Sequence, residues 1–127
     1  MEEKEDFDFV SCALGHFRHP ERAKRLNCAQ SVLKAFQGFL NVSDSLVDSY
    51  SEYGYGRSPG GYCGALFAGK YLLEEHFGVG GLEERFTEAA GSTLCKEIRK
   101  GRKLSCAQCV EEATKFVAEK AEERLRR

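Results

Sequence analysis

The sequence predicts an all-α fold: a single domain over residues 1–127, built as an array of five to seven helices around a central apolar helix. Strand signals are nearly absent, because no segment alternates apolar and polar residues with β-branched enrichment. Apolar residues instead recur at helical spacing almost throughout the chain. A chain of 127 residues is also long enough to bury a core without disulfides.

The first half of the chain predicts short helices separated by clear boundary residues. Pro20 suits the first turn of a helical segment, Asn27 is a good N-cap, and Ser43 or Asp44 can cap a later piece. The loop over residues 54–61 is too rich in glycine to form an element of its own. The predicted helices cover residues 5–15, 21–26, 27–40 and 43–53.

The second half contains the segment that we expect to be central, residues 62–77. Lys70 is its only charge before Glu74, and a helix that is apolar nearly all round is a buried one. Small residues spaced four apart in it, from Gly64 to Gly69, let a neighbouring backbone approach closely. Glycines at 78–81 end it. Further helices are predicted over residues 82–90, 92–100 and 106–127.

The overall composition excludes several classes of function. The net charge of −1 gives no reason to expect binding to nucleic acid or to an anionic membrane. No apolar stretch approaches the roughly 20 residues that span a bilayer, so membrane insertion is not expected. The acidic N-terminus lacks the apolar segment of a secretory signal. We therefore expect a cytoplasmic protein, in which cysteines more often serve metal binding, redox cycling or core packing than disulfides.

The most informative feature is the placement of cysteines where helices begin. Cys28, Cys63, Cys95 and Cys106 each follow a capping residue or glycine, or a short segment that contains one. Free backbone N–H groups and the positive end of the helix dipole stabilise a thiolate and lower the pKa of a cysteine there. Burial as a small hydrophobic side chain is enough to explain any one of these cysteines. It does not explain why four of them lie at helix starts. Cys109 completes a Cys-x-x-Cys pair at the last helix start, the spacing of an attacking and a resolving thiol.

Other polar clusters carry weaker signals. The cations between Cys95 and Cys106 could stabilise thiolates, but such a run is more often a solvated helix end. Cys12, His16 and His19 have metal-ligand spacing, yet the helix ends there and we interpret them as a surface cluster. His76 is interpreted as structural. The glycine and tyrosine loop before Cys63 is as compatible with a plain connection as with a ligand site.

The cysteine blocks resemble the C_GCAxxG_C_C family of redox-active proteins over about residues 21–120. Residues 63–69, Cys-Gly-Ala-Leu-Phe-Ala-Gly, are similar to its mid-chain CGAxxG-type core with one residue inserted. The Asn-Cys-Ala-Gln block at 27–30 and the Gly-Ser-Thr-Leu-Cys block at 91–95 resemble its flanking blocks, and a final cysteine begins the last helix. The resemblance implies redox chemistry through Cys28, Cys63, Cys95 and Cys106 or Cys109.

The favoured function is thiol–disulfide or electron-transfer chemistry by thiols that converge near one end of the array, with a redox partner protein or a small thiol or disulfide as partner. Cys63 is the predicted principal thiolate, Cys28 and Cys95 its neighbours, and Cys106 with Cys109 a resolving pair. This hypothesis requires no cofactor. The alternative is a zinc or iron–sulfur site held by Cys28, Cys63, Cys95 and Cys106. A third is a helical interaction module with structural cysteines. Enzyme activity, the substrate and homo-oligomer formation stay open.

Overall fold

The computed structural model describes residues 8–54 and 57–125, and these residues confirm the all-α prediction. Within them, the only extended pairing is an isolated antiparallel bridge between Tyr62 and Leu94. None of the described helices is long and apolar enough to cross a membrane. The α-helices are α1 (Phe9–Phe17), α2 (Cys28–Ala35), α3 (Gln37–Leu40), α4 (Asp44–Ser49), α5 (Gly64–Leu72), α6 (Leu82–Ala90), α7 (Cys95–Gly101) and α8 (Cys106–Leu125).

Shorter helical turns join some of these helices, and they mark where the structure differs from the sequence prediction. The helix predicted over 27–40 is divided at Phe36, whose φ of −103° and ψ of 5° leave the helical region. The Phe36 ring is fully buried and stacks on Phe9 at 4.4 Å between ring centroids. The turns are the 3₁₀ segments η2 (Arg22–Lys24), η3 (Tyr50–Glu52) and η4 (Pro59–Gly61), and the π-helical turn η5 (Leu73–Phe77).

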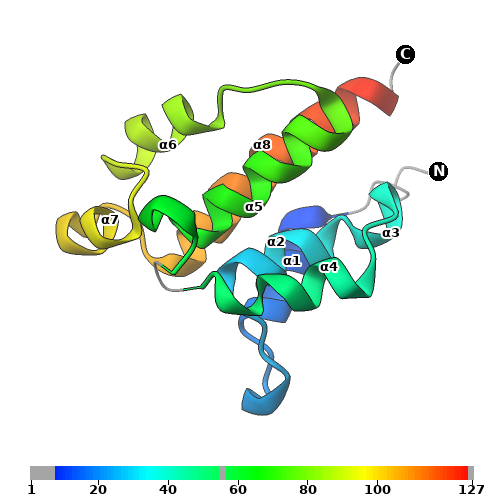
Figure 1. Cartoon of the computed structure of the whole chain (residues 1–127), viewed down its shortest axis with the longest axis horizontal. Coiled ribbons are helices and arrows are strands. Elements are labelled where there is room, and N and C mark those ends of the chain that lie inside the picture. Colours follow the sequence, from blue (N-terminus) through cyan, green and yellow to red (C-terminus); the bar gives the residue numbers. More distant parts are fainter. Residues whose placement is uncertain (1–7, 55–56, 126–127) are drawn as a thin grey trace.

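Helix α5 occupies the centre of the array, as its apolar sequence predicts. Figure 1 shows α5 and α8 running alongside each other, with α1, α2 and α4 packed on one side of the pair. A methyl group added at Gly64 would lie 2.6 Å from the Cys28 Sγ atom, and one at Gly69 would lie 2.8 Å from Leu82 Cδ2 and 3.5 Å from Ala113 Cβ. The small residues of α5 therefore allow α2 on one face and α6 with α8 on the other to approach it closely.

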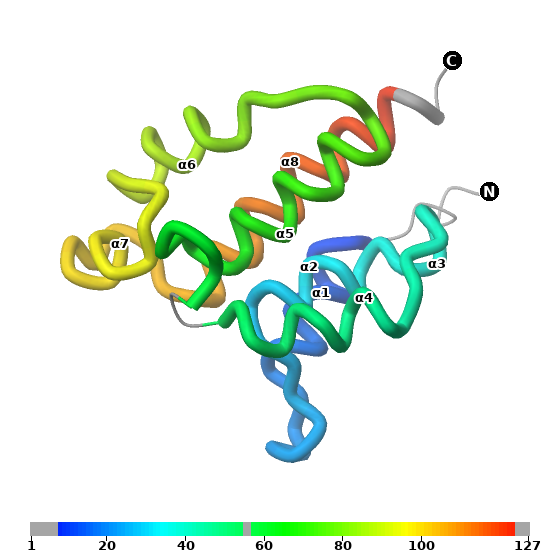
Figure 2. Tube along the Cα trace, in the orientation of Figure 1, coloured from blue at the N-terminus to red at the C-terminus, as the bar shows by residue number. Residues whose placement is uncertain are grey.

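Helices α5 and α8 begin at the same end of the molecule. In Figure 2, α5 and α8 start at the end where α7 lies, and the segment between α1 and α2 projects away from the helices as a separate arm. Because α5 and α8 point the same way, residues at their first turns lie near each other. This arrangement brings the cysteines at the helix starts to one place.

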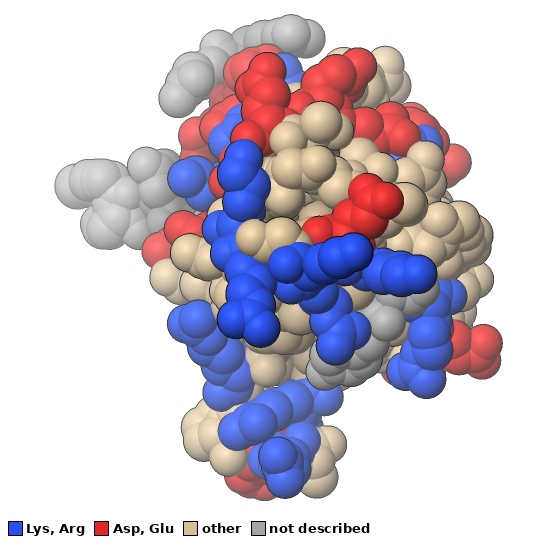
Figure 3. All heavy atoms as spheres, turned by 90° about the vertical axis from the view of Figure 1, so that its left-hand side faces the viewer, with Lys and Arg blue, Asp and Glu red and all other residues tan. Residues whose placement is uncertain are grey.

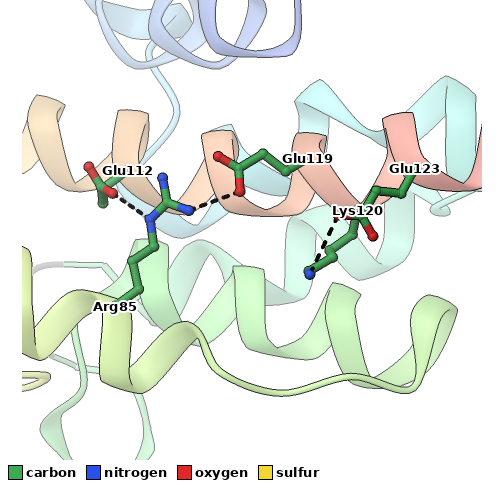
Figure 4. Close-up of polar contacts among 5 residues, drawn as sticks. All are labelled: Arg85, Glu112, Glu119, Lys120 and Glu123. Atoms are coloured by element: carbon green, nitrogen blue, oxygen red, sulfur yellow. Dashed lines mark hydrogen bonds and ion pairs between the residues drawn. The ribbon is translucent and has the colours of Figure 1, made fainter.

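Polar side chains fix α6 against α8 on the opposite side from α2. Arg85 of α6 donates to Glu112 at 2.8 Å and to Glu119 at 3.0 Å, as Figure 4 shows. The Arg85 guanidinium also lies 5.2 Å from the centroid of the Phe116 ring. These half-exposed contacts orient α6 but contribute modestly to stability, since water screens them.

Candidate functional site

Five of the six cysteines line one small cavity at the common end of the helices. We call it the cysteine cavity, and its free volume of about 20 Å³ is room for about one water molecule. All six cysteines lie within the described residues and are in the thiol form. The prediction that the thiols converge is thus supported by the structure. The cavity is lined by Cys28, Cys63, Gly64, Cys95, Ile98, Arg99, Leu104, Cys106 and Cys109.

Two of these cysteines are placed by the same local motif. The Asn27 side chain accepts from the backbone N–H of Gln30 at 2.7 Å, and the Gln30 side chain accepts from the N–H of Asn27 at 3.2 Å. Ser105 and Gln108 make the same reciprocal bonds at 3.1 and 2.8 Å. Each pair is a capping box, so the cap-Cys-Ala-Gln pattern places a cysteine as the first residue of α2 and of α8.

Cys63 and Cys95 are brought together by backbone pairing. The Tyr62–Leu94 bridge joins the residues directly before them, and the Cys63 N–H donates to the Thr93 carbonyl at 2.9 Å. Cys95 is the first residue of α7, whereas Cys63 is the N-cap of α5, where a capping serine or aspartate commonly stands. The Cys63 side chain makes no capping hydrogen bond to the described residues of α5, but the first backbone N–H groups of this helix lie near enough to act on its thiol.

The pKa of Cys63 shows that a helix start alone does not make a thiolate. The backbone N–H groups of Ala65 and Leu66 lower this pKa, as predicted for a helix N-terminus. A hydrogen bond with the Cys109 thiol and burial outweigh them and hold the pKa of Cys63 well above its ordinary value. Cys63 is only 5% exposed. It is therefore a protonated interior thiol in the reduced protein at neutral pH.

Cys106 is the most accessible of the cavity thiols. It is half-buried, whereas the other four are buried. Burial raises the pKa of Cys106, the neighbouring Cys95 and Cys63 thiols raise it further, and the Arg99 guanidinium lowers it. Among the cavity thiols, Cys106 is the one that a molecule from solvent meets first.

Cys106 also lines a second, larger cavity on the outside of the protein. This outer cavity has a volume of about 420 Å³, and its walls are Arg99, Arg102, Leu104, Ser105, Cys106 and Gln108. Arg99, Leu104 and Cys106 belong to both cavities. The thiol thus stands at the boundary between the buried cysteines and a cationic surface.

The surface around this boundary is strongly basic. Figure 3 views the molecule from the end where α7 lies, and Lys and Arg side chains form a broad band across that face. Helix α7 and the loop after it contribute five exposed cations, Lys96, Arg99, Lys100, Arg102 and Lys103. The net charge of the chain is only −1, but in the folded protein many of its positive charges are concentrated on this one face.

Arg99 is the site residue that sequence reasoning did not single out. A run of cations favours a solvated helix end, and Lys96, Lys100 and Lys103 line neither cavity, whereas Arg102 lines the outer one. Cys95, Ile98, Arg99 and Arg102 follow the i, i+3, i+4, i+7 spacing of one helix face. That spacing from Cys95 is the signal that could have separated Arg99 from Lys96 and Lys100.

The remaining sequence candidates lie outside the cysteine cavity. Cys12 is half-buried on α1, where burial raises its pKa. Burial and the charge of Lys34 lower the pKa of His16, and the Nδ1 atom of His19 accepts from the N–H of Glu21 at 3.0 Å. His76 lies in the η5 turn. All three residues are partly buried, and Cys12 packs against the hydrophobic core; their interpretation as a surface cluster stays a prediction.

The thiols of the cysteine cavity do not form a ready ligand set for a metal. Among the residues that the structure describes, no three His, Cys, Asp or Glu side chains are arranged to hold a metal ion. The four cysteines of the metal hypothesis do line the same cavity. In the present arrangement, their sulfur atoms would have to move to bind a zinc ion or a cluster.

Comparison with known proteins assigns the chain to a family. Residues 26–120 match the family described as "Putative redox-active protein (C_GCAxxG_C_C)". All five cysteines of the cavity fall within the matched residues. No curated protein and no solved structure matches the chain significantly. Because the match covers well over half of the sequence, the chain belongs to the C_GCAxxG_C_C family.

Proposed function

We propose that this protein exchanges two electrons with disulfides through the thiols of the cysteine cavity. The observation that carries the proposal is the gathering of Cys28, Cys63, Cys95, Cys106 and Cys109 around a cavity of about 20 Å³. Packing of small apolar side chains would be served by alanine or valine, and does not require sulfur at the starts of four helices. Thiols that line one small cavity are placed for one to attack a mixed disulfide formed on another.

Cys106 is the proposed first reactant, because it is the cavity thiol that reaches the outer surface. Its thiolate attacks one sulfur of an acceptor disulfide, forming a mixed disulfide and releasing one thiolate of the acceptor. A second cavity thiolate then attacks the Cys106 sulfur; Cys95 is the favoured candidate, because it is the thiol with the largest effect on the pKa of Cys106. The second half of the acceptor leaves as a thiolate. Two electrons pass to the acceptor, and the protons of the two cysteines pass to the released thiolates.

Cys63 and Cys109 are the proposed interior pair. Their thiols are hydrogen-bonded to each other and buried, so they can receive a disulfide from the Cys95–Cys106 pair by internal exchange. This arrangement departs from the sequence-based prediction, in which Cys63 is the principal reactive thiolate and Cys106 with Cys109 is the resolving pair. Here Cys106 makes the first contact, and Cys109 is paired with Cys63. Cys28, whose sulfur lies against Gly64 at the cavity wall, is the neighbour of this interior pair.

The proposal agrees with the expected cytoplasmic setting, where a thiol reductant can return the protein to the reduced state. The acceptor is the disulfide of a small molecule or of a partner protein. The alternative function, a zinc or iron–sulfur site, uses four of the same cysteines and predicts that their thiols are masked by the bound group.

Differential alkylation of the reduced, anaerobically purified full chain tests the proposal. After exposure to a disulfide, peptide mapping by mass spectrometry is expected to find bonds within the cavity set, with Cys12 still a thiol. Cys106→Ser should slow the reaction strongly, and Cys12→Ser is the matched control that should leave it unchanged. Stoichiometric metal with masked thiols would replace the redox proposal by the metal-site alternative. Thiols that neither react nor oxidise in protein that contains no metal would refute both.

A further inference from the structure

The outer cavity beside Cys106 is an open hollow with a mostly polar lining and the volume of a small-molecule site. Its volume of about 420 Å³ falls within the roughly 300–1,000 Å³ that ligand sites in proteins occupy. Arg99 and Arg102 supply two cations to its wall, Ser105 and Gln108 supply polar groups, and Leu104 supplies an apolar surface. The cavity therefore offers charge recognition and an apolar contact next to a thiol.

The two arginines have no competing partner in the described part of the chain. Neither guanidinium takes part in an ion pair among those residues. Arg99 lies close enough to Cys106 that its charge lowers the pKa of the thiol. An arginine fork without a carboxylate partner is suited to bind a carboxylate in two hydrogen bonds.

Arg102 also stands at a position where the backbone favours a different residue. It follows the last turn of α7 with φ of 58° and ψ of 23°, the left-handed conformation in which glycine usually ends a helix. An L-residue with a long side chain is strained in this conformation. The Arg102 side chain nevertheless lies at the wall of the outer cavity, so a strained backbone conformation accompanies the placement of its charge there.

We infer that the outer cavity binds the carboxylate of a low-molecular-weight disulfide and presents its sulfur–sulfur bond to the Cys106 thiol. This inference rests on the proposed function and adds the substrate class: a small anionic disulfide, rather than a neutral or cationic one. Arg99 and Arg102 hold the carboxylate, and Leu104 contacts the methylene groups. Each turnover releases two molecules of a carboxylate-bearing thiol and leaves one disulfide in the protein.

Three small disulfides of similar length and different charge test the inference on the reduced full chain. They are 3,3′-dithiodipropionate, which is anionic, bis(2-hydroxyethyl) disulfide, which is neutral, and cystamine, which is cationic. The rate of loss of the Cys106 thiol is expected to be about tenfold faster with the anion than with the neutral compound, and slower still with the cation. The rate with the anion should saturate with concentration, as binding to a site requires.

Substitutions separate the cavity from the general charge of this face. Arg102→Gly removes the guanidinium while relieving the left-handed backbone, so the variant should fold at least as well and still lose most of the anion preference. Arg99→Gln should reduce the preference as well. Lys100→Gln is the matched control, since it removes the same charge from the same helix at a residue outside the cavity. It should leave the preference unchanged.

Each outcome has a distinct meaning. If all three disulfides oxidise Cys106 at similar rates, the cavity inference is refuted and the redox proposal stands. Another outcome is that Lys100→Gln lowers the rate with the anionic disulfide as much as Arg102→Gly does, without saturation. In that case the positive charge of the whole face attracts the anion, as it would attract an acidic partner protein, and no particular cavity binds it. That result also overturns the inference. If none of the three disulfides reacts with Cys106, the proposed function itself fails.

Discussion

Replacing Gly64 by alanine is the sharpest test of how α5 and α2 form the cysteine cavity. An added methyl group would lie 2.6 Å from the Cys28 Sγ atom and 2.8 Å from the Tyr53 carbonyl oxygen. Carbon normally approaches such atoms to about 3.5 Å. The Cys28 sulfur can rotate away, but the Tyr53 oxygen belongs to the backbone and must move with its segment. The cost of such overpacking is about 1–3 kcal/mol.

A compensating gain must be subtracted from this cost. Alanine is favoured over glycine in a helix by about 0.5–1 kcal/mol. We therefore expect Gly64→Ala to lower the free energy of unfolding by about 1.3 kcal/mol, within a range of about 0–2.5 kcal/mol, or the melting temperature by about 5 °C in a domain of this size. Denaturant titration of the reduced protein, followed by circular dichroism, measures the change.

Gly15 provides the matched control for this substitution. It lies within α1, and a methyl group added there would meet no atom within 4 Å. Gly15→Ala should therefore raise stability by about 0.4–1 kcal/mol. If Gly64→Ala proved as stabilising as Gly15→Ala, the close contact of α5 with Cys28 and Tyr53 would be wrong, and with it the shape of the cysteine cavity.

Three further predictions address the caps and the thiols. Asn27→Ala should destabilise the protein by about 1–2 kcal/mol in denaturant titration, since it removes the α2 cap and the bonds from the Asn27 side chain to the Tyr50 and Ser51 carbonyls; Ser105→Ala, which removes only a cap, should cost less. The alkylation rate of Cys106 should rise with pH along a curve displaced to alkaline pH from that of a free thiol, because its pKa is raised. Arg99→Gln should displace the pH curve of Cys106 alkylation further toward alkaline pH, because it removes the charge that lowers the pKa of this thiol. If the curve did not move, Arg99 would not act on Cys106. Because the pKa of Cys63 is raised in the folded protein, its thiol loses the proton at lower pH in the unfolded chain than in the folded one. The free energy of unfolding should therefore fall as the pH rises above about 8.5. In Cys63→Ala, a plot of the free energy of unfolding against pH should show a smaller fall.

Local features of the fold could be predicted from the sequence because local chemistry determines them. The cap-Cys-Ala-Gln blocks form capping boxes within four residues, and the apolar character of α5 is sufficient to predict its burial. The break at Phe36 could not be predicted in this way. It accompanies the stacking of Phe36 on Phe9, a residue from another helix.

The chemistry of the site depended on contacts that no local pattern contains. A helix start predicts a lowered pKa for Cys63, and the responsible N–H groups are in place. The hydrogen bond from a different helix, through Cys109, and burial reverse the direction. Arg99 could not be separated from the other cations of its run for the same reason. It lines the cysteine cavity, and Lys96 and Lys100 do not, because it lies on the face of α7 that packs against the cavity.

The attachment of α7 has a consequence for the kinetics of the buried thiols. Only Cys95 and Ile98 of this helix are buried, and the Tyr62–Leu94 bridge with the Cys63 N–H bond joins its first turn to α5. So few contacts are typical of a segment that opens with a smaller free energy than global unfolding. Transient detachment of α7 would expose Cys95 and Cys63 together. The rate at which these thiols react in the native protein is then set by a local opening equilibrium, which amide hydrogen exchange in α7 would report independently.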